Sequence, residues 1–428
     1  MTFGLSIILM LVAFVVTMLV YPRVLNFARR HKIVDNPNAR KLQRVPVPVM
    51  GGATVFVGFL VATVVMYCVV PHPKVIPIMG ILFVMYLLGL WDDVKDVSPA
   101  VRFMVEMLVV WYMILSLHVE INDLHGLWGI HSIPDQVSVP LSILAGVGIM
   151  NALNLIDGVD GFCSTYGMMA CIVFAIIFYY AGDMGMFSLA LIGIGSLLPF
   201  FFHNVFGKTS KMFLGDGGSL MLGTLLALFA LRALTKDGPC ALYSDQGISL
   251  PALVLAVLAV PVFDTLKVMT VRIANGYSPF HPDKTHLHHL FIDLDFSHLV
   301  TSVIIVNVNV FIVLALVLGW SLGLGVDGQM YLVVILSLAS TWGFYFFAEW
   351  HHQQNDGQGT AFWQRWCQHA KSTNLSGTPL WKGIRKAVDS PFLGGTSPDN
   401  PDTPSSPDTP STPGSPETPA NKIDPRIQ

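Results

Sequence analysis

The chain is dominated by about eleven long apolar stretches, each close to the length that crosses a lipid bilayer. A transmembrane helix needs about 20 mostly apolar residues. By that rule the expected spans lie near residues 3–22, 51–70, 76–91, 99–118, 137–155, 162–181, 185–202, 217–234, 249–268, 300–320 and 329–349. Only 12% of the residues are charged, against about 25% in soluble domains. We therefore predict an all-α polytopic membrane protein.

Residues 1–22 are read as a retained first span, because they lack the basic start and the small-residue cleavage site of a signal peptide. The net charge of −3 is segregated along the chain and indicates no nucleic-acid partner. The five cysteines are scattered without a Cys-x-x-Cys pair, so no disulfide framework or cysteine metal site is indicated.

The basic residues predict an orientation. Lys and Arg concentrate in cytoplasmic segments of membrane proteins. With the N-terminus outside, all of the 24 Lys and Arg residues except Lys74, Arg232 and Lys236 fall in inside segments or at their helix ends. Every unusual polar cluster then lies on the same, cytoplasmic face, with the C-terminus. This shared location favours a functional site over a scaffold.

The polar stretch Asn151–Phe162 lies between two apolar runs, where amides and carboxylates are costly. Four of its side chains recur every three residues: Asn151, Asn154, Asp157 and Asp160. Gly158 and Gly161 are expected to break the helix and let backbone approach a ligand. Amide and carboxylate groups together suit Mg²⁺ and phosphate. A purely structural turn is the alternative.

Two further acidic clusters close or open spans. Asp92 and Asp93 are adjacent at the end of the third span, and neighbouring carboxylates repel unless a cation or a raised pKa accommodates them. The alternative is a solvated helix end with Lys95 as partner. Asp216 lies in Phe213–Ser219, a glycine turn that opens a span. It could simply cap that helix, but the flanking glycines suggest close approach by a ligand.

Two other inside segments carry basic side chains. The loop 278–289 contains four histidines, of which His286, His288 and His289 lie within four positions. It lacks a zinc-binding pattern, whereas its donors suit a sugar nucleotide. Arg40–Arg44, which includes Lys41, leads into Gly51 and Gly52. Such residues usually anchor a helix, but here they lie on the same face as the acids.

Taken in order, these motifs resemble those of the polyprenyl-phosphate N-acetylhexosamine-1-phosphate transferases, over about residues 1–350. The motifs are Pro-Asn-x-Arg-Lys with Gly-Gly, Asp-Asp, Asn-Ala-x-Asn-x-x-Asp-Gly-x-Asp-Gly, Phe-x-Gly-Asp-x-Gly-Ser and Pro-Asp-Lys-Thr-His-x-His-His. The last is similar to the loop of bacterial members that use UDP-GlcNAc and start O-antigen, common-antigen or teichoic-acid linkage lipids. Gln43 departs from the histidine that many relatives carry, which weakens a proton-transfer role for that loop.

The resemblance implies transfer of sugar 1-phosphate from a UDP-N-acetylhexosamine to undecaprenyl phosphate, with release of UMP and with Mg²⁺ or Mn²⁺ as cofactor. It implies that Asp216 and Asn154 bind the metal and that Asp92, or less favourably Asp93, acts on the lipid phosphate. The implied substrate-binding residues are Lys41, Asn151, Asp157, Asp160, His286, His288 and His289. The implied location is the bacterial cytoplasmic (inner) membrane. Dimers occur in the family, and nothing in the sequence defines an interface.

The chain is expected to have three parts: a transmembrane transferase domain at 1–350, a cytoplasmic amphipathic or linker segment at 351–389, and a disordered Ser/Thr/Pro/Asp-rich tail at 390–428. Another UDP-N-acetylhexosamine, a 6-deoxy sugar or MurNAc-pentapeptide, remains an alternative donor. A transporter is the competing class, disfavoured because the polar clusters share one face and no inverted repeat is evident.

Overall fold

The computed structural model describes residues 1–35, 46–278, 286–293, 296–347, 378–390 and 393. In these residues ten helices are long and apolar enough to cross a membrane, or eleven if the bent pair Pro239–Asp245 and Leu250–Val257 forms one span. The prediction of an all-α polytopic membrane protein is confirmed. The spans are α1 (Phe3–Arg30), α2 (Gly51–Val69), α3 (Val75–Val94), α4 (Pro99–Leu117), α5 (Asp135–Leu155), α6 (Phe162–Tyr180), α7 (Met184–Phe206), α8 (Gly215–Leu234), α13 (His298–Ser321) and α14 with its π-helical continuation η3 (Val326–Leu338, Ala339–Gly343).

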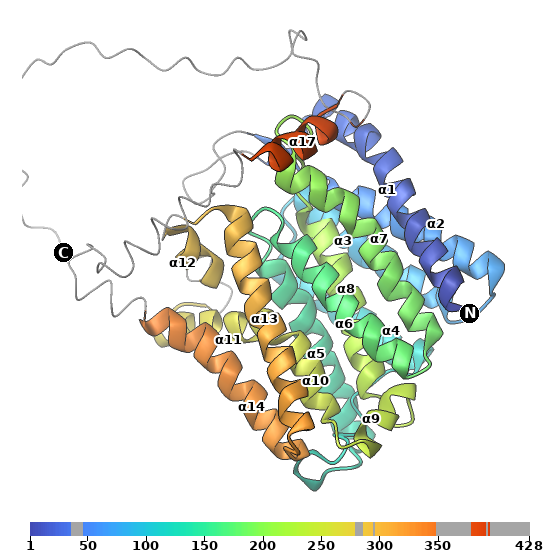
Figure 1. Cartoon of the computed structure of the whole chain (residues 1–428), viewed down its shortest axis with the longest axis vertical. Helices are drawn as coiled ribbons and strands as arrows, with labels where there is room; N and C mark the ends of the chain where they lie inside the picture. The colour runs from blue at the N-terminus through green and yellow to red at the C-terminus, as the bar shows by residue number, and fades with distance from the viewer. Residues whose placement is uncertain (36–45, 279–285, 294–295, 348–377, 391–392, 394–428) are drawn as a thin grey trace, which may run out of the picture.

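Helix α8 forms the centre of the bundle (Figure 1). It packs against α2, α3 and α5, and its residues Leu220–Leu234 contribute no exposed side chain. The outer helices differ, because they present large apolar side chains outward, such as Leu144 at 72% and Tyr180 at 72% exposure. Apolar surface on this scale is typical of contact with lipid.

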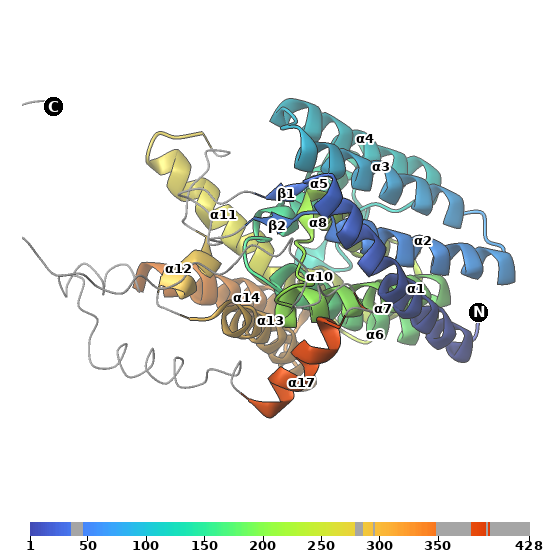
Figure 2. The same cartoon turned by 90° about the horizontal axis from the view of Figure 1, so that it is seen from above.

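The ninth expected span, 249–268, is not one straight helix. It consists of α10 (Leu250–Val257) and α11 (Ala259–Ala274), separated at Leu258, and Figure 2 shows α11 projecting away from α3 and α4. Pro261 has no backbone N–H to continue the ladder. Asn309 satisfies the interrupted backbone: its Nδ2 donates to the Val257 carbonyl at 3.0 Å and its Oδ1 accepts from the Val260 N–H at 3.1 Å.

A short β-structure joins the start of α2 to the start of α8. Strands β1 (Val34–Asp35) and β2 (Val47–Pro48) pair antiparallel, and Val49 forms a parallel bridge with Phe213. The Gly52 N–H then donates to the Leu214 carbonyl at 2.7 Å. A Cβ on Gly52 would lie 2.4 Å from the backbone nitrogen of Gly218, so the two helix starts approach at a distance that only glycine allows.

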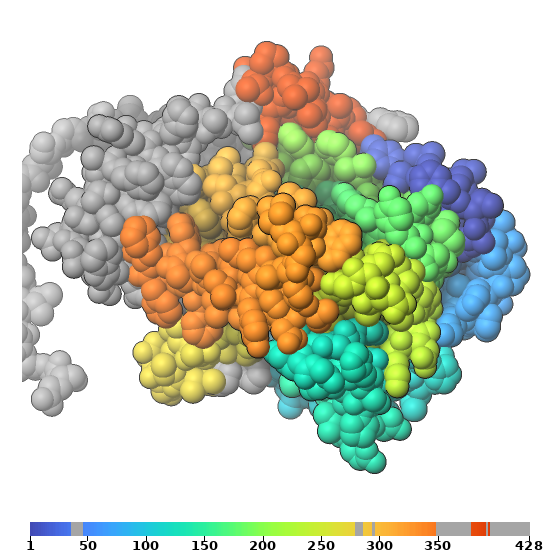
Figure 3. Space-filling view, turned by 60° about the horizontal axis from the view of Figure 1, so that its bottom comes forward, coloured from blue at the N-terminus to red at the C-terminus, as the bar shows by residue number. Residues whose placement is uncertain are grey.

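The remaining elements are short and lie between or beyond the spans. They are η1 (Leu127–Gly129), η2 (Pro239–Ala241), α9 (Leu242–Asp245), α12 (Leu287–Asp293) and α17 (Pro379–Val388). At one end of the bundle the connections after α4 and α8 pack together, as Figure 3 shows. There the Lys236 N–H donates to Asn122 Oδ1 at 2.8 Å and His125 Nε2 lies 3.2 Å from the Leu234 carbonyl oxygen. The described polar motifs, with Asp92, Asn154 and Asp216, gather at the opposite end.

Candidate active site

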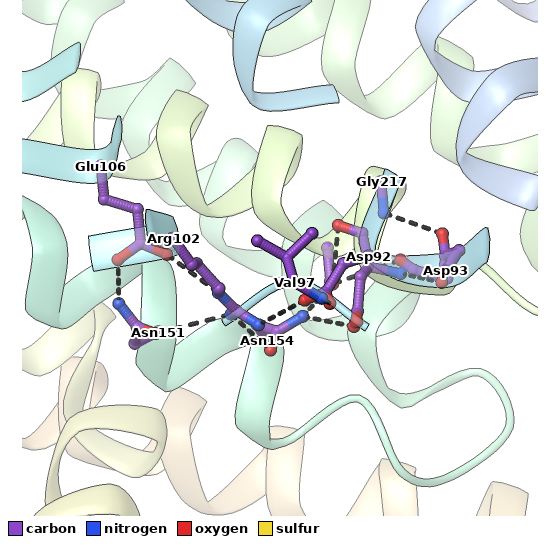
Figure 4. A network of polar contacts seen from close by, with 11 residues as sticks. Asp92, Asp93, Val97, Arg102, Glu106, Asn151, Asn154 and Gly217 are labelled. Atoms are coloured by element: carbon purple, nitrogen blue, oxygen red, sulfur yellow. Dashed lines mark hydrogen bonds and ion pairs between the residues drawn. The ribbon is translucent and has the colours of Figure 1, made fainter. Parts of the chain in front are cut away.

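Arg102 joins three helices at the polar end of the bundle (Figure 4). Arg102 lies on α4. Its guanidinium donates a 3.3 Å hydrogen bond to Asp92 Oδ2, at the end of α3, and a 2.6 Å hydrogen bond to Asn154 Oδ1, at the end of α5. Asp92 has a second donor, the Val97 N–H at 2.8 Å from Oδ1. The partner of Asp92 is therefore Arg102, and the carboxylate is held by a cation and a backbone amide together.

Glu106 lies one helical turn beyond Arg102 and is fully buried. Its Oε1 accepts from Arg102 Nε at 3.1 Å, and its Oε2 accepts from the amide of Asn151. Asn151 also accepts a long hydrogen bond, 3.4 Å, from Arg102. A buried carboxylate is costly unless it is paired and hydrogen-bonded, and both conditions are met here. The pair Arg102–Glu106 thereby fixes the side chain of Asn151.

Asn154 links this network to Asp216. Its Nδ2 donates to Asp216 Oδ1 at 2.7 Å and to Ser219 Oγ at 2.9 Å, while its Oδ1 faces Arg102. Both ends of the Asn154 amide are thus engaged by protein groups. The arrangement orients one carboxylate oxygen of Asp216, at the first turn of α8.

Asp93 binds the start of α8. Its Oδ1 accepts from the Asp216 N–H at 2.9 Å and its Oδ2 accepts from the Gly217 N–H at 3.1 Å, as Figure 4 shows for Gly217. The first N–H groups of a helix have no partner within the helix, so Asp93 caps α8 from a different helix. Gly215 precedes this turn with a φ of +75°, a left-handed conformation that favours glycine.

The glycines around Asp216 have packing roles. A Cβ on Gly217 would lie 3.2 Å from the backbone nitrogen of Leu90, and one on Gly218 would lie 2.8 Å from the Cα of Gly52. The two glycines thus have a packing role, and the expected close approach of a ligand stays a prediction. They let α8 approach α3 and α2 closely, which brings Asp216 next to Asp93.

The stretch Asn151–Phe162 breaks as expected, because α5 ends at Leu155 and α6 begins at Phe162. Asp160 accepts from Lys211 Nζ at 2.6 Å, and its Oδ2 lies 2.9 Å from His298 Nδ1. Burial alone would raise the pKa of Asp160, but the hydrogen bond from His298 and the charge of Lys211 outweigh it and keep this pKa below its usual value. Asp160 is therefore an ionised, fully paired carboxylate.

Asp157 is different, because its carboxylate has no hydrogen-bond or ion-pair partner among the described residues. Burial, together with the negative charges of Asp216, Asp93 and Asp160, raises the pKa of Asp157 to about 8. An unpaired carboxyl group surrounded by other acids is stabilised by a cation or by a proton. The Asp157 carboxylate thus has coordination positions that no described protein group occupies.

The histidines reach the same end of the bundle through Asp264, a residue of α11 that the sequence motifs did not single out. Asp264 Oδ2 lies 2.9 Å from His286 Nδ1, and its Oδ1 accepts from the Leu287 N–H at 3.0 Å. The His288 ring stacks on that of His286 with centroids 5.6 Å apart, and the His289 ring lies 4.3 Å away on a tilted plane. Burial lowers the pKa of His288.

His288 also lies against the turn that carries Asp157. A Cβ on Gly158 would lie 2.6 Å from His288 Nε2, so glycine is required for this approach. Nε2 is buried and has no hydrogen-bond partner among the described residues. The histidine segment and the Asn151–Phe162 stretch therefore form adjoining walls of one site.

The donor chemistry of this site fits a hard divalent cation. Mg²⁺ usually takes one or two carboxylates and completes its shell with water and substrate phosphates. Asp157 and Asp216 supply two carboxylates that repel each other. Within the described part of the chain, no three His, Cys, Asp or Glu side chains converge as a complete metal cage. These side chains therefore suit an ion that also binds a substrate phosphate, and they do not form a metal site made of protein ligands alone.

Most of the predicted site residues are brought together, and Lys41 lies outside the described residues. Sequence reasoning did not identify Arg102, Glu106, Asp264 or Lys211. The first two had a usable signal: a basic and an acidic residue four positions apart within an apolar span, where charged residues are rare. Lys211 had none, since its partner Asp160 is 51 positions away.

Comparison with known proteins places the chain among membrane transferases. A relative from Bacillus subtilis strain 168, named a probable undecaprenyl-phosphate N-acetylglucosaminyl 1-phosphate transferase, is 32% identical over 320 residues, 72% of this chain and 84% of the relative. The family model described as "Glycosyl transferase family 4" matches residues 75–234. The chain belongs to this family. The matched region of glycosyl transferase family 4 runs from α3 to α8 and contains the whole Arg102 network.

Two further relatives carry the name undecaprenyl-phosphate alpha-N-acetylglucosaminyl 1-phosphate transferase. The Yersinia pestis protein is 28% identical, with 62% of this chain and 71% of the relative covered. The Escherichia coli K12 protein is 26% identical, with 63% and 72% covered. The family resemblance drawn from the sequence motifs is confirmed, and with it the assignment of the chain as a transferase enzyme.

Proposed function

We propose that the protein transfers N-acetylglucosamine 1-phosphate from UDP-N-acetylglucosamine to undecaprenyl phosphate, giving undecaprenyl-diphosphate-N-acetylglucosamine and UMP, and so initiates a cell-envelope glycan such as O-antigen. The observation that carries the proposal is the junction of Arg102, Asn154 and Asp216 at the end of membrane helices, in a chain 32% identical to a relative named as a probable undecaprenyl-phosphate N-acetylglucosaminyl 1-phosphate transferase. Such a junction suits a reaction between a water-soluble diphosphate and a lipid phosphate.

The reaction balances as a single displacement. An oxygen of the lipid phosphate forms a bond to the sugar-linked phosphorus of the UDP-sugar. The bond from that phosphorus to the oxygen shared with the uridine phosphate breaks, and UMP leaves with that oxygen. Phosphoryl transfer of this kind depends on positioning and charge neutralisation more than on covalent chemistry with the protein. No covalent intermediate on an aspartate is required.

Asp216 and Asp157 are the residues that would hold Mg²⁺ or Mn²⁺, because both carboxylates face the same cluster and Asp157 lacks a protein partner among the described residues. Bound there, the ion would neutralise charge on the diphosphate oxygens. Asn154 then serves to orient Asp216, since its two amide ends already bind Arg102 and Asp216. Asp93 sets the position of Asp216 by binding its backbone N–H.

Asp92 is the proposed base for the lipid phosphate. It lies 14% exposed at the end of α3, with Oδ2 3.3 Å from Arg102 Nη1. A monoprotonated lipid phosphate beside it gives up its proton as the new bond forms. Asn151 and Asp160 shape the nucleotide side of the site, and the histidines His286, His288 and His289 provide donors for the sugar and the diphosphate. Lys41, outside the described residues, is proposed as a further phosphate ligand.

The polar end of the bundle is proposed to face the cytoplasm of a bacterial inner membrane. The support is the distribution of Lys and Arg along the sequence, in which only Lys74, Arg232 and Lys236 fall outside the segments expected to be cytoplasmic and their helix ends. UDP-sugars are made in the cytoplasm, so this orientation supplies the donor. A homodimer is compatible with the chain, but no described surface argues for one.

The test is UMP release by the purified protein supplied with undecaprenyl phosphate, Mg²⁺ and a panel of UDP-sugars. The expected result is release with UDP-N-acetylglucosamine only when the lipid is present. Release with a different UDP-N-acetylhexosamine alone would reassign the donor to a 6-deoxy sugar or to MurNAc-pentapeptide. No release with any sugar would overturn the proposal.

A further inference from the structure

The loop between α7 and α8 connects the site to the C-terminal segment of the chain. On one side, Lys211 binds Asp160 at 2.6 Å, and Phe213 pairs with Val49 just before Asp216. On the other side, the backbone N–H groups of residues 208–210 bind Asp389, the residue that follows α17. A small shift of this loop would therefore move residues on both walls of the site.

Asp389 binds three consecutive backbone amides of this loop. Its Oδ1 accepts from the N–H groups of Thr209 at 3.1 Å and Ser210 at 2.9 Å, and its Oδ2 accepts from the Lys208 N–H at 3.0 Å. The Ser210 hydroxyl donates to the same Oδ1 at 2.9 Å. Successive N–H groups that converge in this way form a strong anion-binding concavity. The anion bound here is a side chain of the protein itself.

The electrostatics of Asp389 agree with this geometry. Burial on its own would raise the pKa of Asp389, but the hydrogen bonds from the backbone of Lys208 and Ser210 outweigh it and hold this pKa below its usual value. The carboxylate is therefore charged in the docked state at neutral pH. Hydrogen bonds to a charged group are roughly twice as strong as neutral ones.

Helix α17 docks beside this contact through its apolar side. The Trp381 ring lies 4.5 Å from the ring of Phe206, the last residue of α7, and Arg385 Nε donates to the Phe206 carbonyl at 3.2 Å. Val388 is buried. The opposite side of α17, with Lys382 and Lys386, is exposed. Figures 1 and 2 both show α17 against the end of α7.

The loop is also held by side chains of α1 and α7, so a change in the Asp389 contact would affect the position of the residues that follow it in the loop. The Tyr21 hydroxyl donates to the Ser210 carbonyl at 2.8 Å, and His203 Nδ1 lies 3.1 Å from the Ser210 hydroxyl. Ser210 is thus held by α1, α7 and Asp389 together. Its neighbour Lys211 binds Asp160 directly beyond this fixed residue.

We propose that Asp389 is a positioning residue. When α17 is docked, the Asp389 carboxylate binds the backbone N–H groups of residues 208–210 and holds this loop in place. The fixed loop in turn holds Lys211 against Asp160 and the start of α8 beside Asp93. The docking stands on the geometry alone. Its effect on turnover rests on the proposed transfer reaction.

The test compares full-length wild type, Asp389→Ala, Asp389→Asn and the matched control Lys382→Ala, an exposed residue of the same helix. Hydrogen exchange is followed in peptides that cover residues 206–213 and 157–162, in detergent or nanodiscs. We expect Asp389→Ala to speed exchange at residues 208–210 at least about tenfold and to speed exchange at 157–162 as well. Asp389→Asn, which keeps one acceptor oxygen, should restore part of the protection, and Lys382→Ala should match wild type.

UMP release is measured on the same four proteins. We expect Asp389→Ala to lower kcat about threefold to tenfold with little change in KM for the lipid, because a misplaced Lys211 and Asp216 affect the reacting geometry. Unchanged exchange at 208–210 would overturn the docking, and faster exchange there with no change at 157–162 would overturn the positioning role. No UMP release by wild type would refute the proposed function instead, while the exchange data would still decide the docking.

Discussion

At the scale of single residues, the site consists of acids whose environments differ sharply. Asp160 and Asp92 have cationic partners, Asp93 has two backbone donors, and Asp157 has no described partner. The sequence motifs predicted that these acids converge. They could not predict which side chain pairs with which. Arg102 binds partners 10 and 52 positions away, on helices whose rotation depends on packing.

Replacing the carboxylates proposed for chemistry should remove activity without unfolding the protein. Asp92→Asn and Asp216→Asn keep the shape of the side chains but remove charge. We expect UMP release to fall by about 100-fold or more in Asp92→Asn, the range for loss of a proton-transfer group, and to fall strongly in Asp216→Asn, which loses a carboxylate proposed to hold the metal. Asp96→Asn, on an exposed residue just beyond α3, is the control and should retain normal activity. Near-normal turnover in both purified active-site variants would exclude the proposed roles.

Asp157 predicts a pH dependence of stability. Its pKa is about 8 in the folded protein and about 3.9 in an unfolded chain. The unfolded state therefore loses this proton first, and the free energy of unfolding falls as pH rises between about 4 and 8. Asp157→Asn removes this penalty, so without divalent ions the melting temperature of the variant should exceed that of wild type more at pH 8 than at pH 5.5.

The measurement is thermal unfolding in EDTA at both pH values. Asp237→Asn, an exposed carboxylate at the far end of α8, serves as the control and should follow wild type at both. An equal gap between Asp157→Asn and wild type at pH 5.5 and pH 8 would contradict the raised pKa.

At the scale of elements, the long apolar stretches predicted the helices well, because a lipid-exposed backbone has few alternatives to a helix. The break between α10 and α11 was not predicted. It depends on Asn309, about 50 positions beyond the break, which supplies hydrogen bonds to Val257 and Val260. Likewise, the glycines near Asp216 were recognised as unusual, but their packing against α2 and α3 required the tertiary structure.

The contact between α2 and α8 predicts that Gly52→Ala is destabilising. The new Cβ would lie 2.4 Å from the Gly218 nitrogen, a backbone atom that cannot move without shifting α8. Overpacking of this kind costs about 1–3 kcal/mol, and it would also displace Asp216. Gly80→Ala is the control, because no atom lies within 4 Å of its added Cβ in the middle of α3. Thermal unfolding should show a lower midpoint for Gly52→Ala alone, and equal midpoints would argue against the close approach.

At the scale of the whole molecule, the acids at the ends of α3, α5 and α8 depend on a scaffold that extends to residue 389. The family match ends at Leu234, yet the histidine segment and α17 contact the same end of the bundle. The sequence predicted a cytoplasmic amphipathic or linker segment at 351–389 and a disordered tail at 390–428, of which residues 351–377, 391–392 and 394–428 lie outside the described residues. The docking of Asp389 could not be predicted from the sequence, because its partners are three backbone N–H groups and every residue type except proline carries one.

Two truncations separate the docked segment from the chain beyond it. A protein that ends after Leu393 keeps α17 and Asp389, so we expect its UMP release and its melting temperature to equal those of the full chain. A protein that ends after Gly377 loses α17, the Trp381–Phe206 contact and the carboxylate at residues 208–210. We expect its kcat to fall about as far as that of Asp389→Ala, because both changes free the same amides. Adding a synthetic peptide of residues 378–393 should restore part of that loss, since the peptide carries every described contact of α17. A shorter protein with full activity would mean that α1 and α7 hold the loop unaided, through Tyr21 and His203.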